Sequence, residues 1–338
     1  MRWVLLLVVL ASCSRSQAES DVGPEAERAF YYWRTTFALS ARERTALVDA
    51  QVTKLYVRTF DLDWNATENR AVVLGGLTAS EPAPPGVEVV PVVFIKQDVF
   101  KHAGGARELA QLTWAEVSRR VKPLGVVPRE LQLDCDWTDT TRDRFFAYVR
   151  EVRAASHVAL SATIRLHQIK YRERTGVPPV DRGMLMFYNM GSFSADVGSR
   201  AIFDPAIAEQ YLGRVSSYPL ALDLALPVWS WTLQLRDDMP VNLLQSTDPD
   251  ELPAVDFLDA AGPDRFVATR SAFLHGAMIR EGDILKVERM RPAAARAAGA
   301  QIAPHLPAGT RTISLFDLSE RNLDRYGTDD LDQIFHAR

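Results

Sequence analysis

Cysteine is scarce in this chain: 338 residues include two, Cys13 and Cys135. Small proteins held together by disulfides need several cysteine pairs, and cysteine-rich zinc sites need about three or four cysteines in one cluster. Both kinds of scaffold are therefore excluded. The fold must rest on a hydrophobic core, and a composition with 47% hydrophobic residues supplies ample material for one.

An excess of positive charge is also lacking. The formal net charge is −4 and the isoelectric point is near 5.9. Proteins that grip nucleic acid present a basic surface to its phosphates, so we expect no nucleic-acid partner. Long apolar runs are missing as well: beyond the first residues, no segment approaches the about 20 apolar residues that a membrane-spanning helix needs.

The beginning of the chain has the pattern of an export signal. Arg2 precedes an unbroken apolar run at residues 3–11 (WVLLLVVLA), which is too short to span a bilayer and is typical of a secretory signal. The run ends in Leu10-Ala11-Ser12-Cys13, which resembles the lipobox of bacterial lipoproteins. The resemblance implies a signal peptide at residues 1–12, a lipid on Cys13 and a lipidated tether at residues 13–26.

A lipid on Cys13 would make the membrane a partner without any spanning segment. Ser14 follows the cysteine, where sorted lipoproteins of double-membrane bacteria that stay at the inner membrane carry aspartate. The resemblance therefore implies a cell-envelope protein at the outer membrane, on its periplasmic face or at the surface. The alternative is an ordinary secretory signal that happens to contain a cysteine.

Residues 27–338 alternate between strand-like and helix-like segments. Short runs rich in β-branched and aromatic residues predict eight strands, at residues 30–37, 54–64, 87–95, 131–138, 159–167, 183–190, 220–231 and 312–318. Helices are predicted at 142–155 and 205–215, and capping boxes at residues 40–43 (SARE) and 113–116 (TWAE) indicate where two others begin. This alternation predicts an α/β fold, a TIM (β/α)8-like barrel. An open doubly wound sheet is the alternative.

Two segments break the alternation. Residues 67–86 are rich in proline and weakly periodic, where a crossover helix is expected. Residues 266–290 favour antiparallel strands around a turn at 280–283 (REGD). We therefore predict an antiparallel β insertion before the last strand, at about residues 264–292.

Polar residues gather where the predicted strands end, which is the edge where TIM barrels carry their active sites. Asp134, Asp136 and Thr138 share one face of the fourth strand, because alternate residues of a strand point the same way. Two carboxylates on one inward face repel each other, which raises the pKa of at least one. Arg165 and His167 share a face of the fifth strand, and Arg165 could neutralise an aspartate. The alternative is a buried ion-pair network that only stabilises the barrel.

Three short motifs resemble those of chitinase-type glycoside hydrolases. Residues 134–138 (DCDWT) are similar to the end of their fourth-strand motif, Asp-x-x-Asp-x-Asp-x-Glu. Residues 186–189 (MFYN) are similar to their Met-x-Tyr-Asp, and residues 224–229 (LALPVW) to their Gly-x-Pro-x-Tyr/Trp. From about Phe30 onward the chain also resembles an uncharacterised family of bacterial lipoproteins expected to be TIM barrels. These resemblances imply a polysaccharide or oligosaccharide partner, with Tyr188 and Asn189 holding the substrate.

The chain departs from the hydrolase motifs at three positions. Thr138 stands where those enzymes have their catalytic glutamic acid, Leu131 replaces the first aspartate, and Asn189 replaces the sixth-strand aspartate. A threonine hydroxyl cannot protonate a glycosidic oxygen at physiological pH. If the protein is an enzyme, another carboxyl group must act.

Aspartates at strand ends are therefore the catalytic candidates, because glycosidases use two carboxyl groups beside the scissile bond. The candidates are Asp134, Asp136, Asp61 and Asp63, with Asp139 just beyond the fourth strand. A divalent metal between Asp61 and Asp63 would lack a His or Glu to complete its ligands. We predict neither a metal nor a cofactor.

Aromatic and polar residues near the strand ends are candidates for substrate binding. Aromatic faces stack on sugar rings, although Trp137, which alternates with the aspartates, is expected in the core. The predicted binding residues are Tyr31, Trp33, Arg58, Thr138, Arg165, His167, Tyr188, Asn189, Trp229 and Trp231.

The sequence thus predicts an envelope-anchored barrel that acts on or binds a polysaccharide. In the favoured hypothesis, a glycoside-hydrolase-like enzyme, Asp136 is the leading acid/base and Asp134 tunes its pKa. One alternative is a non-catalytic glycan-binding lipoprotein, in which Thr138 marks lost catalysis. The other is an envelope scaffold without a ligand.

Overall fold

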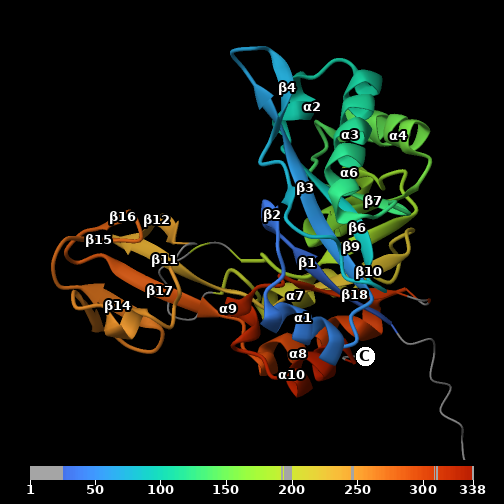
Figure 1. Ribbon diagram of the computed structural model, residues 1–338. Coiled ribbons are helices and arrows are strands. Elements are labelled where there is room, and N and C mark those ends of the chain that lie inside the picture. Colours follow the sequence, from blue (N-terminus) through green and yellow to red (C-terminus); the bar gives the residue numbers. More distant parts are fainter. Residues whose placement is uncertain are drawn as a thin grey trace, which may run out of the picture.

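The computed structural model describes residues 26–191, 193, 200–244, 247–307, 309 and 311–336. The predicted signal peptide, Cys13 and the tether before Ala26 lie outside these residues. In the part described, eight parallel strands form a closed ring in the order β1, β3, β6, β7, β8, β9, β10, β18 (Figure 1). β1 closes the ring because it pairs with both β3 and β18. This closure confirms the TIM-like barrel and excludes the open doubly wound sheet.

The barrel strands follow the eight predicted ones in number and order. They are β1 (Glu27–Tyr32), β3 (Lys54–Asn65), β6 (Glu88–Ile95), β7 (Glu130–Cys135), β8 (Ala159–Arg165), β9 (Arg182–Met186), β10 (Leu222–Pro227) and β18 (Thr312–Phe316). The predicted strand at 220–231 is in fact two strands, because the chain leaves the barrel after Pro227 and enters a second sheet at Ser230.

Helices lie outside the ring of strands, between successive barrel strands in the chain and after the last of them. They are α1 (Ala41–Asp49), α2 (Asp98–His102), α3 (Ala106–Val121), α4 (Arg142–Ser156), α5 (Leu166–Lys170), α6 (Arg172–Thr175), α7 (Pro205–Leu212), α8 (Pro292–Ile302), α9 (Glu320–Leu323) and α10 (Thr328–Phe335), with 3-10 turns η1 (Lys122–Leu124), η2 (Leu252–Ala254) and η3 (Ala303–His305). The large core between barrel and helices includes Trp137, as predicted.

One of the two predicted capping boxes is confirmed. Ser40 caps α1: its hydroxyl accepts a hydrogen bond from the Glu43 main-chain N–H, and the Glu43 carboxylate accepts one from the Ser40 N–H. The prediction at Thr113 is wrong, because α3 begins seven residues earlier, at Ala106. The residues before Thr113 are already helical, so its hydroxyl bonds to the Leu109 carbonyl and to the Tyr148 hydroxyl, both at 2.8 Å.

The weakly periodic segment after the second barrel strand forms a hairpin instead of a crossover helix. β3 continues past the barrel and pairs antiparallel with β4 (Arg70–Leu74), and the hairpin projects at the upper end of the molecule in Figure 1. The short strands β2 (Thr36–Phe37) and β5 (Thr78–Ala79) then pair beside it. The pairing of β3 with β6 shifts register between Arg58 and Phe60.

The predicted antiparallel insertion is present and larger than expected. Its main sheet has the order β12-β11-β17-β14-β13, and it stands to one side of the barrel (Figure 1). The strands of the insertion are β11 (Ser230–Arg236), β12 (Met239–Leu244), β13 (Leu258–Ala260), β14 (Arg265–Ala268), β15 (Ala272–Leu274), β16 (Ala277–Ile279) and β17 (Ile284–Arg289). It has its own hydrophobic core, which includes Leu252, Phe257 and Leu285.

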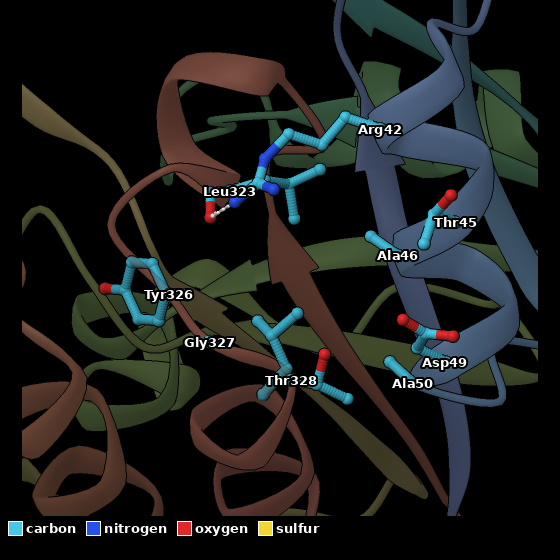
Figure 2. Close-up of a pocket in the computed structure, with 10 residues that line it drawn as sticks. Arg42, Thr45, Ala46, Asp49, Ala50, Leu323, Tyr326, Gly327 and Thr328 are labelled. Carbon is cyan, nitrogen blue, oxygen red and sulfur yellow. Dashed lines mark hydrogen bonds between the residues drawn. The ribbon is translucent and has the colours of Figure 1, made fainter.

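The C-terminal helices pack against the first helix of the chain. Figure 2 shows a small pocket of about 170 Å³ between α1 and the segment from α9 to α10. Arg42 of α1 donates a hydrogen bond to the Leu323 carbonyl at 2.8 Å and forms an ion pair with Asp324. These contacts hold the end of the chain against the barrel. No helix in the described ranges is long and apolar enough to cross a bilayer.

Candidate functional site

A groove lies over the C-terminal ends of the barrel strands. Its larger part has a volume of about 690 Å³, and an adjoining part of about 350 Å³ shares Arg165, Tyr188 and Asn189 with it. The larger part is lined by Trp33, Asp134, Arg165, Tyr188, Asn189, Trp229, Ser230, Trp231, Phe316, Asp317, Ser319, Arg321 and Asn322. Asp136, Leu166, His167, Met190 and Tyr211 complete the smaller part. Most of the predicted site residues therefore meet in one place.

The two fourth-strand aspartates lie in different surroundings. The Asp134 side chain is 6% exposed, and its carboxylate accepts a hydrogen bond from the Thr163 hydroxyl at 2.6 Å. The Asp136 side chain, one step beyond the end of β7, is 54% exposed. Arg165 Nε donates to Asp136 Oδ1 at 2.6 Å, and Arg165 Nη2 lies 3.8 Å from Asp134 Oδ1. Arg165 thus neutralises an aspartate, as the sequence suggested.

The pKa of Asp134 is raised, as predicted for one member of the pair. The main cause is burial, which disfavours the charged form, and repulsion by Asp136 adds to it. The positive charge of Arg165 opposes both effects. Repulsion between the two carboxylates follows from the strand pattern alone, whereas the depth of the Asp134 side chain does not.

Aromatic side chains line the groove opposite these acids. The Trp229 ring packs edge-on against Tyr188 with centroids 4.8 Å apart, and it lies 5.4 Å from Phe316. Trp231 lies 6.1 Å from Trp229, and Trp33 lies 5.3 Å from Phe316. The indole N–H of Trp231 donates to Glu288 Oε2 at 3.2 Å, which fixes its ring. These rings form a partly exposed apolar surface of the kind that stacks on sugars.

Tyr188 and Asn189 follow β9 and join the two parts of the groove. The Tyr188 hydroxyl donates to the sulfur of Met186 at 3.0 Å, and burial raises the pKa of the phenol, so it stays protonated. Asn189 has a φ of +53°, a left-handed conformation that asparagine tolerates better than most residues. Its side chain is exposed. Both residues are placed to contact a ligand.

Five predicted residues do not line either part of the groove. Tyr31 is fully buried inside the barrel, where its hydroxyl donates to Gln132 Oε1. Thr138 accepts a hydrogen bond from Gln97 Nε2 at 3.0 Å and belongs to the loop before α4. The other three lie on β3: Arg58 pairs with Asp61 through two contacts of 2.7 and 2.9 Å, and Asp63 pairs with Lys96 at 2.6 Å.

His167 lies one residue inside helix α5 and not on a strand, since β8 ends at Arg165. It lines the smaller part of the groove together with Asp136. The pKa of His167 is lowered, mainly by burial, while the charge of Asp136 opposes the shift. The ring is therefore neutral at pH 7 and can donate or accept a hydrogen bond.

Sequence reasoning missed the residues after the last strand. Phe316 ends β18, and Asp317, Ser319, Arg321 and Asn322 follow it along the groove. Asp317 could have been found by the rule that singled out Asp136, because it too is a carboxylate directly after a barrel strand. No cluster of three or more His, Cys, Asp or Glu that could hold a metal occurs among the residues described.

No family model matches the chain, and no curated protein matches it. Solved structures do resemble it. The spore cortex-lytic enzyme SleL of Bacillus cereus is 13% identical over 93% of this chain and 74% of its own, with a TM-score of 0.55. A chitinase of Chromobacterium violaceum is 12% identical over 93% and 100%, with a TM-score of 0.52. An immunomodulatory active chitinase of Trichuris suis is 9% identical over 92% and 99%, with a TM-score of 0.54. At these identities the likeness shows a shared fold.

Proposed function

We propose that the groove binds a polysaccharide chain and hydrolyses one of its glycosidic bonds. The observation that carries the proposal is that carboxyl groups and a surface of aromatic rings share one groove at the C-terminal end of a TIM-like barrel. Aromatic faces bind the C–H faces of sugars, and carboxyl groups are the usual catalysts of glycoside hydrolysis. The likeness in fold to proteins described as chitinases and as a spore cortex-lytic enzyme supports this substrate class.

In this proposal Asp136 acts as the base that activates water. Its side chain is exposed to the groove, and Arg165 Nε donates a hydrogen bond to Asp136 Oδ1 at 2.6 Å, which orients the carboxylate. Asp134 also lines the groove, but it is only 4% exposed, so we give it a supporting role. It bonds to Thr163 and lies close to Arg165, so it fixes the arginine that orients Asp136.

Hydrolysis is tested with colloidal chitin and purified bacterial cell-wall sacculi, by measuring the release of reducing ends. Asp136→Asn keeps the shape of the side chain and removes the base, so turnover should fall by about 10²–10⁴-fold while binding persists. Asp143→Asn, which changes an exposed carboxylate on α4, is the matched control. If Asp136→Asn keeps wild-type turnover, Asp136 is not the base.

A second candidate is a protein that binds the glycan without cleaving it. Thr138, in place of the glutamic acid of the hydrolases whose motif it resembles, favours this alternative. It predicts saturable binding to chitin or sacculi with no reducing ends released. Both candidates predict that Trp229→Ala weakens binding about tenfold, or about 1.4 kcal/mol. Trp64→Ala should not weaken it, because Trp64 stacks on His102 away from the groove.

We further propose that the protein is held at the cell envelope by a lipid on Cys13. The apolar run at residues 3–11 and the lipobox-like residues 10–13 support this. The barrel begins at Glu27, so a tether of about 13 residues would join it to the membrane.

A further inference from the structure

Asp317 stands on the side of the groove opposite the fourth-strand aspartates. It directly follows β18, and in the closed ring β18 lies four strands from β7 in either direction. Asp136 directly follows β7. Tyr188, which follows β9, lies between the two sides, and the charges of Asp134, Asp136 and Asp317 all act on its hydroxyl. A sugar bound beside Tyr188 would therefore have carboxyl groups on two sides.

Among the described residues, Asn322 is the one neighbour that donates a hydrogen bond to the Asp317 side chain. Asn322, which is 4% exposed, donates from Nδ2 to Asp317 Oδ1 at 2.7 Å and to the Asp317 carbonyl at 3.0 Å. Within the described chain, Oδ2 accepts no hydrogen bond from another residue. This oxygen is left for a ligand in the groove, which Asp317 and Asn322 both line.

The surroundings of Asp317 favour its protonated form. Burial raises its pKa to about 6, and the negative charge of Glu43 in α1 adds to the shift. Arg34 after β1 and the hydrogen bond from Asn322 oppose it. The other titratable groups that line this part of the groove are Asp134, Arg165, Arg321 of α9 and Tyr188, which stays neutral. A carboxylic acid with these properties can release a proton near neutral pH.

We propose that Asp317 is the proton donor of the hydrolysis, with Asp136 as the base across the groove. This inference rests on the proposed function. Asp317 gives its proton to the glycosidic oxygen as the bond from that oxygen to the anomeric carbon breaks. Water attacks the anomeric carbon, and its proton goes to Asp136. The products are a sugar with a free reducing end and the departing alcohol, and the proton on Asp136 returns to Asp317 through solvent.

Neither fourth-strand aspartate fits the role of donor as well. Asp136 Oδ1 is engaged by Arg165 Nε at 2.6 Å, and the Asp134 side chain is 6% exposed with Oδ1 bonded to Thr163. Because Asp136 and Asp317 follow strands on opposite sides of the ring, we assign the inverting arrangement, in which a water molecule stands between the base and the sugar.

The test uses the full-length protein with Asp317→Asn, an isosteric change that still accepts the hydrogen bond from Asn322. Release of reducing ends from colloidal chitin or sacculi should fall by about 10²–10⁴-fold. The 2,4-dinitrophenyl glycoside of the same sugar should still be cleaved within about tenfold of the wild-type rate, because its leaving group departs without a proton. Asp329→Asn, which alters an exposed carboxylate on α10, is the control.

The pH profile gives a second measure. For the wild type, kcat/KM should fall as the pH rises through about 6, because the donor must be protonated. Asn322→Ala removes a hydrogen bond to the charged carboxylate, which should raise the pKa of Asp317 further. The fall in kcat/KM should therefore move to higher pH, while activity persists. A purely structural role for Asn322 would leave the pH at which kcat/KM falls unchanged.

Three outcomes would overturn the proposal, and they are distinguishable. If the wild type is active and Asp317→Asn is equally active on the polysaccharide, Asp317 is not the donor, although the proposed function stands. If the first product keeps the anomeric configuration of the substrate, the assignment of Asp136 and Asp317 as base and donor is wrong. If the wild type releases no reducing ends from either polysaccharide and does not cleave the activated glycoside, the proposed hydrolysis fails and Asp317 has no such role.

Discussion

Three aspartates at the barrel mouth differ in what surrounds them. Asp134 is buried beside Thr163, Asp136 is exposed and bonded to Arg165, and Asp317 is bonded to Asn322. Burial disfavours charge, whereas a neighbouring guanidinium favours it. One residue type thus provides a buried group, an exposed group bonded to an arginine, and a group whose pKa is raised to about 6.

The environment of Asp317 predicts a pH-dependent stability that does not depend on any substrate. Its pKa is about 6 in the folded protein and about 3.9 in an unfolded chain. The folded state therefore binds the proton more tightly, and the stability that protonation contributes is complete below pH 4 and is lost as the pH rises through 6. Asp317→Asn does not titrate, so its free energy of unfolding relative to that of the wild type should increase by up to about 3 kcal/mol between pH 4 and pH 7.5.

Urea unfolding at the two pH values measures this difference. Asp329→Asn serves as the control, because Asp329 is exposed and its stability difference from the wild type should change little with pH. If the stability difference between Asp317→Asn and the wild type is the same at pH 4 and pH 7.5, the pKa of Asp317 is not raised by folding.

At the scale of elements, the insertion and a long loop shape one wall of the groove. Glu288 of β17 accepts hydrogen bonds from the main-chain N–H groups of Ala201 and Ile202 and from the Trp231 indole. It thereby ties β11, β17 and the segment before α7 together. The position of the Trp231 ring is therefore fixed by a carboxylate on the neighbouring strand.

Helices α3 and α4 are pinned together by a buried pair of hydroxyl groups. Thr113 Oγ1 and the Tyr148 hydroxyl lie 2.8 Å apart, and both side chains are fully buried. Thr113→Val keeps the shape and leaves the tyrosine hydroxyl without this partner, so unfolding should become easier by about 1–3 kcal/mol. Thermal or urea unfolding measures the loss.

The double variant Thr113→Val/Tyr148→Phe is the matched control for this pair. It replaces both partners by apolar groups, so most of the lost stability should return. If the double variant is as unstable as the sum of the two single variants, the two hydroxyl groups do not depend on each other.

At the scale of the whole molecule, the groove and the start of the barrel lie at opposite ends. All barrel strands run in the same direction, so β1 and the other strands begin at one end of the barrel. The groove lies at the other end, where the strands finish. The proposed lipid on Cys13 precedes this start of β1 in the chain.

The proposed anchor predicts that Cys13 carries a lipid. Metabolic labelling with radioactive palmitate should label the wild type and not Cys13→Ser. Cys135→Ser is the matched control and should be labelled like the wild type, because Cys135 is buried in the barrel. Equal labelling of Cys13→Ser and the wild type would contradict the lipoprotein assignment.

The eight strands, their order and the inward placement of Asp134 were predictable because alternation along a strand is a local property. The start of α1 was predictable for the same reason, since its capping box spans four neighbouring residues. At Thr113 an identical type of pattern failed, because the residues before it are helical and no short motif encodes where a helix has already begun.

What the sequence by itself determined is the set of local elements and the face on which each strand carries its polar residues. Only the tertiary structure decided which strand ends meet. The groove joins residues that follow β7, β9 and β18, more than 180 positions apart along the chain, and Arg58 and Lys96 bond to the acids of β3. Closure of the barrel brings distant positions together through packing of the whole molecule, and no local periodicity carries that information.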